Sequence, residues 1–385
     1  LDWFVENAPT SGPSAASFRG CCYYLNRFYD NIGHEIHGQS TSGFSKKSYD
    51  FDSNSDNRFI WKVGEGSVKD LNLMTNYADK TKTRNTLAHE FGKLSGTPYH
   101  FCFPVRVHLN AAFHGVMDLM EDGDDRMLER NGLDGDGAFY KMYDGLASTG
   151  NGEKKTRLTE DKSDLQALIN GLNTSTHIST RRTYAYDNVN IPACVNYLVT
   201  RTLTSDRDHG HKNFYIYRDT NRTREWRLIV WDVDLSFGHD WSNSSGYFDD
   251  VIYHINPIRP GHTTNNRLYQ IIAEAPEFRA MYLRRLRTVM DIVFQPPGTT
   301  NGLLETRMRQ IAASVDPDPA DPSAWTDGDL DAARWGVWGR GFKPREEAEY
   351  VIANHFSQRR AFLYDQNSAT RQLFGLDAGT GDPIP

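Results

Sequence analysis

The stretch from residue 204 to residue 240 constrains the fold more than any other part of this chain, because it has the pattern of a β-hairpin. Asn213–Arg218 and Glu225–Val233 are rich in aromatic and β-branched residues, which favour strands. The polar segment Asp219–Arg224 between them is typical of a turn. An antiparallel hairpin brings its two open ends together, so we expect the segments before and after it to lie side by side.

Acidic and amide side chains gather at these open ends. Asp208 precedes the first strand, Asn213 begins it, and Asp232 and Asp234 close the second. Mg²⁺ prefers oxygen ligands and usually takes one or two carboxylates together with substrate phosphates. A further carboxylate beside an incoming hydroxyl can orient that hydroxyl or accept its proton. In protein kinases a catalytic aspartate, an asparagine five residues later, a hairpin and a metal-binding aspartate follow in this order, and Asp208 and Asn213 have that spacing.

Three other interpretations of this segment remain open. The acidic groups could be the solvated ends of a hairpin. His209 and His211 form an H-x-H pair that could bind Zn²⁺. A glycosyltransferase could use Asp232-Val-Asp234 to hold a metal ion and a nucleotide sugar, but we would then expect a β-α-β alternation before this triplet, and none precedes it.

A loop rich in glycine and serine lies in the first part of the chain, at residues 37–49. Its glycines have the spacing of a P-loop, but Phe44 stands where the lysine of that motif should be. Lys46 and Lys47 follow on a predicted strand. Backbone N–H groups of such a loop could cover phosphate groups, and either lysine could contact phosphate oxygens.

The composition excludes several classes of protein. The formal net charge of −7 argues against a protein that binds nucleic acid by neutralising its phosphates. No apolar run approaches the roughly 18–20 residues of a membrane-spanning helix. The four cysteines have no C-x-x-C spacing and are too few for a disulfide framework. With 38% hydrophobic and 24% charged residues, we expect a soluble, folded protein with no transmembrane segment and no nucleic-acid partner.

The pattern of predicted elements changes along the chain. The front part is rich in strand-like segments, whereas the later part is mainly helical. Pro276 separates two predicted helices, and the stretch 316–331, rich in aspartate and proline, is predicted to be a surface loop or linker. We therefore predict one compact α+β unit, with a strand-rich part at residues 1–125 and a helix-rich part at residues 126–385 that contains the hairpin.

Taken together, these segments resemble the CotH kinase family, the atypical protein kinases named after a bacterial spore-coat protein. Members typically have an R-G-N-S/T loop followed by K-K-S-Y, a D-x-S-x-x-R-N segment, a strand pair ending in glutamate, an L-Y-K element, and two motifs around a hairpin. The matching segments occur here in the same order: His37–Thr41 with Lys46–Tyr49, Asp79–Asn85, Val105–Glu121, Phe139–Lys141, Asp208–Tyr217 and Trp231–Gly238. The resemblance runs from about residue 25 to residue 368.

The resemblance implies an atypical protein-kinase-like fold around a nucleotide cleft and ATP-dependent phosphorylation of protein hydroxyl groups. Asp208 would be the catalytic carboxylate. Mg²⁺ or Mn²⁺ would be held by Asn213 and Asp232, with Asp234 as the rival of Asp232. The residues implied for the nucleotide are Lys47, Lys141, Glu121 and Trp226. Glu121 could instead end a strand, and Trp226 could be a packed aromatic residue of the hairpin.

The chain departs from the family pattern at a few positions. His37 and Gln39 replace the usual arginine and asparagine of the first loop, Met117 stands where tyrosine is frequent, and Val230 replaces a proline. The first-loop substitutions favour a second hypothesis, a structural or surface-layer protein that keeps the fold without turnover. The family's surface associations and the absence of an initiator methionine favour an extracellular or cell-surface location, where the protein substrate would be a surface or coat protein. The sequence does not indicate the oligomeric state.

Overall fold

The structure is a computed structural model in which the described residues are 1–7, 18–38, 40–206, 208–239, 266–318, 321, 323–336 and 343–364. The chain divides into two units. Unit 1 comprises residues 1–86, 100–122 and 307–349, and unit 2 comprises residues 87–99, 123–306 and 350–385. The two units therefore interleave along the chain, whereas the sequence analysis divided it once, near residue 125.

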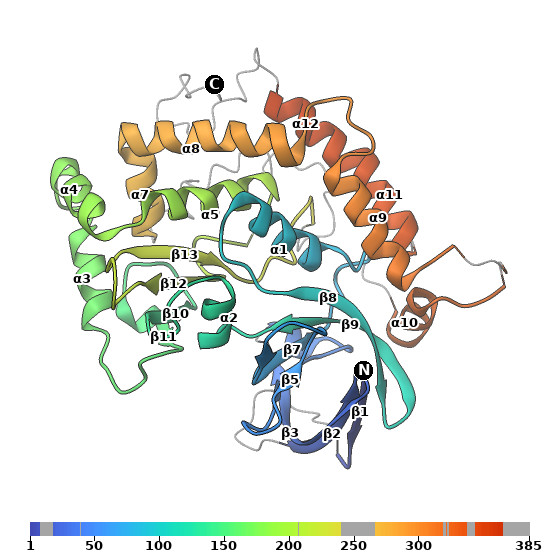
Figure 1. Ribbon diagram of the computed structural model, residues 1–385. Helices are drawn as coiled ribbons and strands as arrows, with labels where there is room; N and C mark the ends of the chain where they lie inside the picture. Colours follow the sequence, from blue (N-terminus) through green and yellow to red (C-terminus); the bar gives the residue numbers. More distant parts are fainter. Residues whose placement is uncertain are drawn as a thin grey trace. The chain divides into compact units, whose positions relative to one another are not determined.

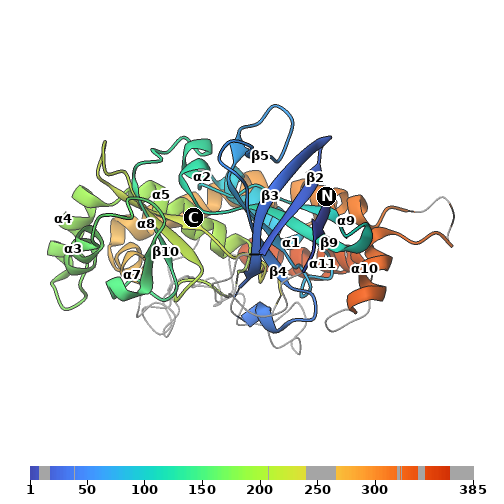
Figure 2. The same ribbon diagram turned by 90° about the horizontal axis from the view of Figure 1, so that it is seen from below.

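Unit 1 is built on a closed barrel whose strands follow the order β1-β2-β3-β4-β7-β9-β8. The strands are β1 (Asp2–Val5), β2 (Phe18–Tyr24), β3 (Arg27–His37), β4 (Ser48–Asp52), β7 (Asp70–Met74), β8 (Cys102–Leu109) and β9 (Ala112–Glu121). β1, β2 and β3 lie side by side, as Figure 2 shows. β1 closes the barrel by pairing in parallel with β8, with Asp2 opposite His108. A short pair, β5 (Phe59–Ile60) and β6 (Ser67–Val68), lies outside the barrel order.

The barrel strands form because apolar side chains alternate with polar ones and point into a common interior. Trp3 at the centre of this core is completely buried, with its ring 4.8 Å from that of Tyr49 and 5.1 Å from that of Phe51. Its buried neighbours in the cluster include Tyr29, Ile32, Ile36, Leu71, Leu73, Val107, Met117 and Leu119. The prediction of a strand-rich front part is confirmed.

Unit 1 also contains a helix from the far end of the chain, α10 (Asp327–Trp335). Thr326 caps its first turn, and Asp331 in its second turn is buried and accepts a hydrogen bond from the backbone N–H of Val116 at 2.9 Å. The prediction that residues 316–331 form a surface loop or linker is therefore wrong at its C-terminal end. An aspartate that finds a buried partner in another part of the chain gives no sign of this in its local sequence.

Unit 2 contains a four-stranded sheet in the order β11-β10-β12-β13. The strands are β10 (Ala138–Met142), β11 (Gly152–Lys154), β12 (Phe214–Arg218) and β13 (Trp226–Val230). β12 and β13 form the predicted hairpin, with Phe214 opposite Val230 and Arg218 opposite Trp226. β10 pairs with the other edge of β12, and the side chains of the hairpin are buried over most of its length.

Unit 2 also contains most of the helices of the described residues. They are α2 (Asp125–Arg130), α3 (Ser163–Gly171), α4 (Ile178–Asn188), α5 (Ile191–Leu203), α7 (Arg267–Glu274), α8 (Pro276–Val289) and α12 (Ser357–Tyr364). α5 lies along β13, and α8 packs on α5 (Figure 1). The predicted break at Pro276 is confirmed, because this proline begins α8.

Three further helices, α1 (Arg84–Ser95), α9 (Leu303–Val315) and α11 (Pro344–Val351), have residues in both units. Short π-helical turns, Met290–Phe294 and Ile352–Phe356, follow α8 and α11. The mixed architecture, with strands concentrated in the first part of the chain and helices in the later part, agrees with the predicted α+β class. No helix among the described residues has the length and apolar character needed to cross a membrane.

Candidate functional site

One buried arginine of α5 connects the segment before β12 with the segment after β13, at the open end of the hairpin. Arg201 is 0% exposed and is ion-paired with Asp206. Its guanidinium also donates hydrogen bonds to backbone carbonyl oxygens, namely those of Asn213, of Trp231 at 2.7 Å and of Asp232 at 3.5 Å. The planar fork of five N–H donors suits such a set of acceptors. A single side chain therefore holds the start of β12 beside the segment that follows β13.

Asp206, which is ion-paired with Arg201, in turn holds the backbone of Asp208 in place. Asp206 is completely buried, and its Oδ1 accepts a hydrogen bond from the backbone N–H of Asp208 at 3.0 Å. Burial raises the pKa of Asp206 to about 6, although the Arg201 charge acts in the opposite direction. The aspartate two residues before the predicted catalytic residue is thus structural, and it fixes the loop that carries Asp208.

The Asp208 carboxylate lies in a strongly polar setting. Lys212 Nζ lies 2.9 Å from its Oδ2, and His211 Nε2 lies 3.2 Å from its Oδ1. Burial alone would raise the pKa of Asp208, but the hydrogen bonds and charges of His211 and Lys212 outweigh it and bring the pKa to about 2. The side chain is 12% exposed and is ionised at neutral pH.

Asn213 and Asp208 are brought into direct contact, as the five-residue spacing predicted. Asn213 Nδ2 donates to the backbone oxygen of Asp208 at 2.8 Å and to its Oδ2 at 3.0 Å. Asn213 has a φ of +60°, which asparagine tolerates better than most residues. Its Oδ1 accepts no hydrogen bond from any described residue, so the amide presents the type of oxygen that a hard cation takes.

Asp232 and Asp234 follow β13 and are both partly buried. The backbone of Asp232 has a φ of +51°, and its carbonyl oxygen is the acceptor of Arg201 described above. Within the described residues, no three His, Cys, Asp or Glu side chains form a cluster that could hold a metal ion. Asn213 carries an amide oxygen, and Asp232 and Asp234 carry carboxylates, which are the ligand types that Mg²⁺ prefers.

The two histidines of the H-x-H pair have separate partners. His209 Nδ1 lies 2.9 Å from the hydroxyl oxygen of Tyr269 on α7, and His211 faces Asp208. The Tyr269 hydroxyl in turn donates to Tyr197 on α5 at 3.0 Å. These contacts tie the acidic loop to two helices.

Lys141 on β10 lies close to the segment after β13. Its Nζ is 4.8 Å from the centre of the Trp231 ring and 5.6 Å from that of Tyr143. Since Trp231 immediately precedes Asp232, the structure places this predicted phosphate-binding lysine beside the acidic end of the hairpin. All of these groups belong to unit 2.

Trp226 and Glu121, two residues that the resemblance implied for the nucleotide, are both enclosed. Trp226 is 2% exposed, and its ring centre is 6.1 Å from that of Tyr140. Glu121 is 1% exposed and ends β9, where its Oε2 accepts a hydrogen bond from the backbone N–H of Phe101 at 3.4 Å. Such burial argues against direct contact of either side chain with a nucleotide.

In unit 1 the first of the two adjacent lysines is the buried one. Lys46 is 0% exposed, and its Nζ donates to Asp331 Oδ1 at 2.7 Å, to Asn76 Oδ1 at 3.1 Å and to the carbonyl oxygen of Val116. Burial, and then the nearby Lys82 charge, lower the pKa of Lys46 to about 7. Asp331 and Asn76 were missed by sequence reasoning because no motif connects them with Lys46.

Lys47 bends back onto the glycine- and serine-rich loop. Its Nζ donates to the backbone oxygens of Ser42 at 2.5 Å and Phe44 at 3.4 Å. The 3₁₀ turn Ser40–Gly43 lies in this loop. Lys47 is only partly buried, so it can hold the loop and still face a ligand.

The Asp79–Asn85 segment is a rigid turn at the start of α1. Asp79 accepts hydrogen bonds from the backbone N–H groups of Thr81, Thr83 and Arg84 at 2.8–3.0 Å, and it is ion-paired with the Arg84 side chain. Asn85 donates to Asp118 on β9 at 3.2 Å. The turn that resembles the family segment is therefore bound to the barrel.

These features define a mixed α/β protein with an ionised aspartate, an oriented asparagine and a second aspartate at one end of a hairpin, and with a lysine-bearing loop on a barrel. The sequence matches the profile of the family described as CotH kinase protein over residues 35–363, and the chain belongs to this family. The resemblance predicted from its motifs is thus confirmed. Membership of a kinase family implies ATP, a divalent metal ion and a protein substrate in general terms.

Among solved structures, the chain is similar to the Helicobacter pylori proinflammatory kinase CtkA. The two are 11% identical, the match covers 96% of this chain and 99% of that one, and the TM-score is 0.31. No curated protein matches the chain.

Proposed function

We propose that this chain is an ATP- and divalent-metal-dependent phosphotransferase that acts on protein hydroxyl groups. The observation that supports this most is the set of bonds around Arg201, which holds Asn213 and Asp232 by their backbones and, through Asp206, the backbone of Asp208. These are the three residues for which the chemistry needs fixed positions. Family membership supports the reaction class.

Asp208 is suited to orient the acceptor hydroxyl. With its pKa near 2 it is ionised at neutral pH and is a weak base. It would accept the hydrogen bond of the substrate hydroxyl and hold that oxygen in line with the phosphorus. It would take the proton late, when the new P–O bond has made the hydroxyl acidic.

Asn213 Oδ1 and the Asp232 carboxylate are the proposed ligands of Mg²⁺ or Mn²⁺, and Asp234 is the rival of Asp232. The metal ion, when held by these residues, would supply positive charge to offset that of the phosphate groups. Asp208 keeps the Asn213 amide oriented, because Asp208 Oδ2 accepts a hydrogen bond from Asn213 Nδ2. Changing either member of this pair should therefore disturb the other.

Lys141 and Lys47 are the proposed contacts to phosphate oxygens. Lys141 lies over Trp231, next to the proposed metal ligand Asp232. Lys47 uses two donors on the loop carbonyls and retains a third N–H. Phosphate binding by Lys47 would also stabilise the loop, since one ammonium would serve both.

The first test is ligand-dependent thermal stability. ATP with Mg²⁺ or Mn²⁺ at about 100 times its dissociation constant should raise the free energy of unfolding by about 2.7 kcal/mol. Asp232→Ala should reduce this gain, whereas Asp291→Ala, in a partly exposed ion pair with Arg287, should leave it unchanged. Stabilisation by UDP-sugars and not by ATP would replace our proposal with a glycosyltransferase that uses Asp232-Val-Asp234.

The second test is transfer itself. The chain should transfer labelled γ-phosphate to protein, and Asp208→Asn should lower the rate by about 100-fold or more while ATP still stabilises the variant. We propose that the acceptors are surface or coat proteins in an extracellular or cell-surface setting. ATP binding without transfer to any such protein would favour the structural or surface-layer hypothesis.

A further inference from the structure

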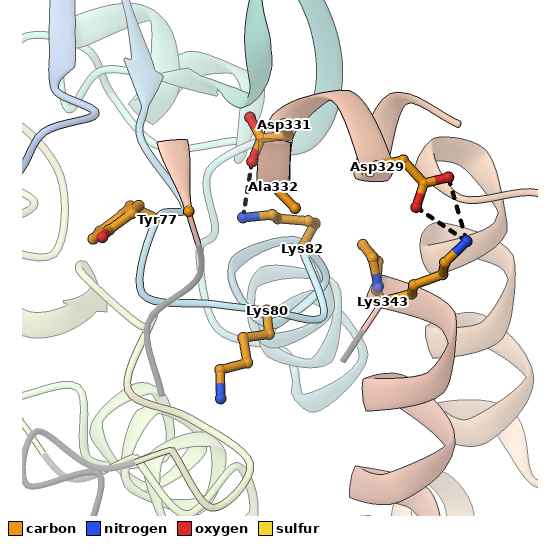
Figure 3. A pocket seen from close by; sticks show the side chains of 10 residues that line it. Tyr77, Lys80, Lys82, Asp329, Asp331, Ala332 and Lys343 are labelled. Atoms are coloured by element: carbon orange, nitrogen blue, oxygen red, sulfur yellow. Dashed lines mark hydrogen bonds and ion pairs between the residues drawn. The ribbon is translucent and has the colours of Figure 1, made fainter. Parts of the chain in front are cut away.

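Unit 1 has a cavity of about 280 Å³ whose wall carries more lysines than aspartates (Figure 3). Three lysines, two aspartates, one tyrosine and several small residues line it: Tyr77, Lys80, Lys82, Gly328, Asp329, Asp331, Ala332, Gly336, Lys343 and Pro344. None of them belongs to the set proposed above for phosphoryl transfer. The pocket therefore needs an explanation of its own.

Lys82 is the most constrained of the three lysines. Its side chain is 8% exposed, and its Nζ lies 3.3 Å from Asp331 Oδ2 and donates to the carbonyl oxygen of Asn76 at 3.0 Å. Its φ of +55° is uncommon for a lysine, and the turn held by Asp79 maintains it. Lys80 comes from the same turn, so two lysines are presented from one rigid segment.

Asp331 is shared between two cations. Its Oδ1 faces Lys46 at 2.7 Å, and its Oδ2 faces Lys82 at 3.3 Å. Elsewhere around the pocket Asp329 faces Lys343, and burial raises the pKa of Glu347 against the opposing charges of Arg84 and Lys80. The lining itself carries three ammonium groups and two carboxylates, so a bound anion would add to the negative charge that faces these lysines.

Lys343 provides a solvent-exposed donor at the other side of the pocket. Its side chain is 49% exposed, and its Nζ lies 3.0 Å from Asp329 Oδ1. An ion pair with so much solvent exposure contributes little, so Lys343 can turn towards a ligand at small cost. In the view of Figure 3, Lys343 and Asp329 lie at one side, Tyr77 lies at the other, and Lys80 and Lys82 lie between them.

We propose that this pocket binds a terminal phosphate group through the ammonium groups of Lys80, Lys82 and Lys343. A phosphate monoester offers three acceptor oxygens and up to two charges, whereas a carboxylate offers two oxygens and one charge, so phosphate is the better match for three point-charge donors. The volume lies just below the range of about 300–1,000 Å³ typical of drug-sized ligands, which favours a small phosphate ester or a phosphorylated side chain.

Direct binding by calorimetry tests this on the full chain at constant ionic strength. The probes are inorganic phosphate, O-phosphoserine, and ATP in the presence of a chelator. We expect O-phosphoserine to bind, and Lys343→Gln and Lys82→Met each to weaken it by about tenfold, because each removes a hydrogen bond to a charged group. Lys62→Gln, which removes an exposed charge of the same unit outside the pocket, should bind as the wild type does.

A further variant is expected to bind O-phosphoserine more tightly than the wild type, a result that a misfolded protein would not give. Asp329→Asn removes the carboxylate that competes for Lys343, so it should strengthen O-phosphoserine binding by about threefold. Failure of all three probes to bind, or binding that neither lysine variant weakens, would overturn the proposal.

Competition identifies the source of the phosphate. If ATP displaces O-phosphoserine and Lys343→Gln weakens both, the pocket takes the terminal phosphate of the nucleotide. If O-phosphoserine stays bound at saturating ATP, the pocket takes a phosphorylated residue, and either result upholds phosphate binding. Asp208→Asn should leave this binding intact even if it abolishes transfer, so the pocket and the proposed function can fail separately.

Discussion

The amine of Lys46 is completely buried. Its ammonium is surrounded by Asp331, Asn76 and the Val116 carbonyl oxygen, and burial together with the Lys82 charge brings its pKa to about 7. Removing a charge from water is costly unless partners are close, and the pKa shows that the partners here compensate only in part. Lys46 should therefore contribute to the pH dependence of the free energy of unfolding.

We expect stability to rise with pH because of Lys46. In the unfolded chain its pKa should be near 10.5, so between about pH 7 and 10.5 the unfolded chain binds more protons than the folded chain. As pH rises from about 7 to 10.5, the titration of Lys46 therefore increases the free energy of unfolding. Below about pH 7, Lys46 is protonated in both states and does not contribute to the pH dependence. Urea denaturation near pH 7 and pH 9 should show this gain in the wild type, on the order of 1–3 kcal/mol, and not in Lys46→Met.

The control for this measurement is Lys62→Met. Lys62 is 62% exposed, so its loss should leave the pH dependence of the wild type unchanged. The interpretation of Lys46 would be wrong if Lys46→Met and the wild type had the same pH dependence.

Arg201 should be the most sensitive single residue of unit 2. Arg201→Met leaves Asp206 as a buried carboxylate without its cation, which should lower the free energy of unfolding by about 3–5 kcal/mol. Arg201→Lys keeps the charge but not the fork of donors, so it should fold, bind ATP more weakly with Mg²⁺ and lose transfer. Denaturation and label transfer, measured on the same preparations, separate the two effects.

Arg287→Met is the matched control for Arg201. Arg287 forms an ion pair with Asp291 in which the side chains are 33% and 47% exposed, so its loss should cost less than about 1 kcal/mol. If Arg201→Met were as stable as Arg287→Met, the central role that we give to Arg201 would be untenable.

Single residues of the site were predictable only where their partners are near in sequence. Asp208 and Asn213 are hydrogen-bonded across five positions, and a spacing this short can be recognised in the order of residues alone. Arg201 contacts Trp231, which lies 30 residues away, and Lys46 contacts Asp331, which lies 285 residues away. No local pattern distinguishes such residues from surface charges.

At the level of elements, α10 is attached to the barrel through β9. Asp331 accepts from the Val116 N–H at 2.9 Å, and Trp335 Nε1 donates to the carbonyl oxygen of His114 at 2.6 Å. Gly115 lies between these contacts, where a Cβ atom would be 2.7 Å from Asp331 Oδ1. The close approach of the helix therefore requires glycine at this position of the strand.

We expect Asp331→Ala to loosen this attachment. It leaves Lys46 and Lys82 without their common carboxylate and should destabilise unit 1 by about 3–5 kcal/mol. The Val116 amide should also exchange its hydrogen faster, because its acceptor is gone. Hydrogen exchange and urea denaturation measure the two effects.

Asp327→Ala in the same helix is the control. Asp327 pairs with Arg106, and their side chains are 25% and 46% exposed, so its loss should cost less than about 1 kcal/mol. Unchanged exchange at Val116 in Asp331→Ala would show that the helix is held by other contacts.

Some elements are determined by local sequence, and others by contacts with distant parts of the chain. The hairpin β12–β13 and the start of α8 at Pro276 follow local rules of periodicity, turn residues and proline geometry, and both were predicted. α10 was not, because aspartate and proline in its neighbourhood are typical of loops. Its position is determined by Asp331, whose burial depends on a strand elsewhere in the chain.

For the whole molecule, the mixture of strands and helices was predictable, but the closure and interleaving of the units were not. The barrel closes where Asp2 and Trp3 pair in parallel with His108 and Leu109. Strand propensity predicts that a segment is extended, but it does not predict which distant segment pairs with it. The assignment of residues 307–349 to unit 1 likewise rests on long-range packing.

The distance in sequence between Lys46 and Asp331 has a consequence for how the protein is made. Lys46 leaves the ribosome before its partner, because the carboxylate that it needs is synthesised 285 residues later. At roughly 5–20 residues per second, the amine waits about 15–60 seconds for its counter-ion. A nascent chain therefore cannot complete unit 1 until residues 307–349 have been synthesised, which gives chaperones a long interval in which to protect the unfinished unit.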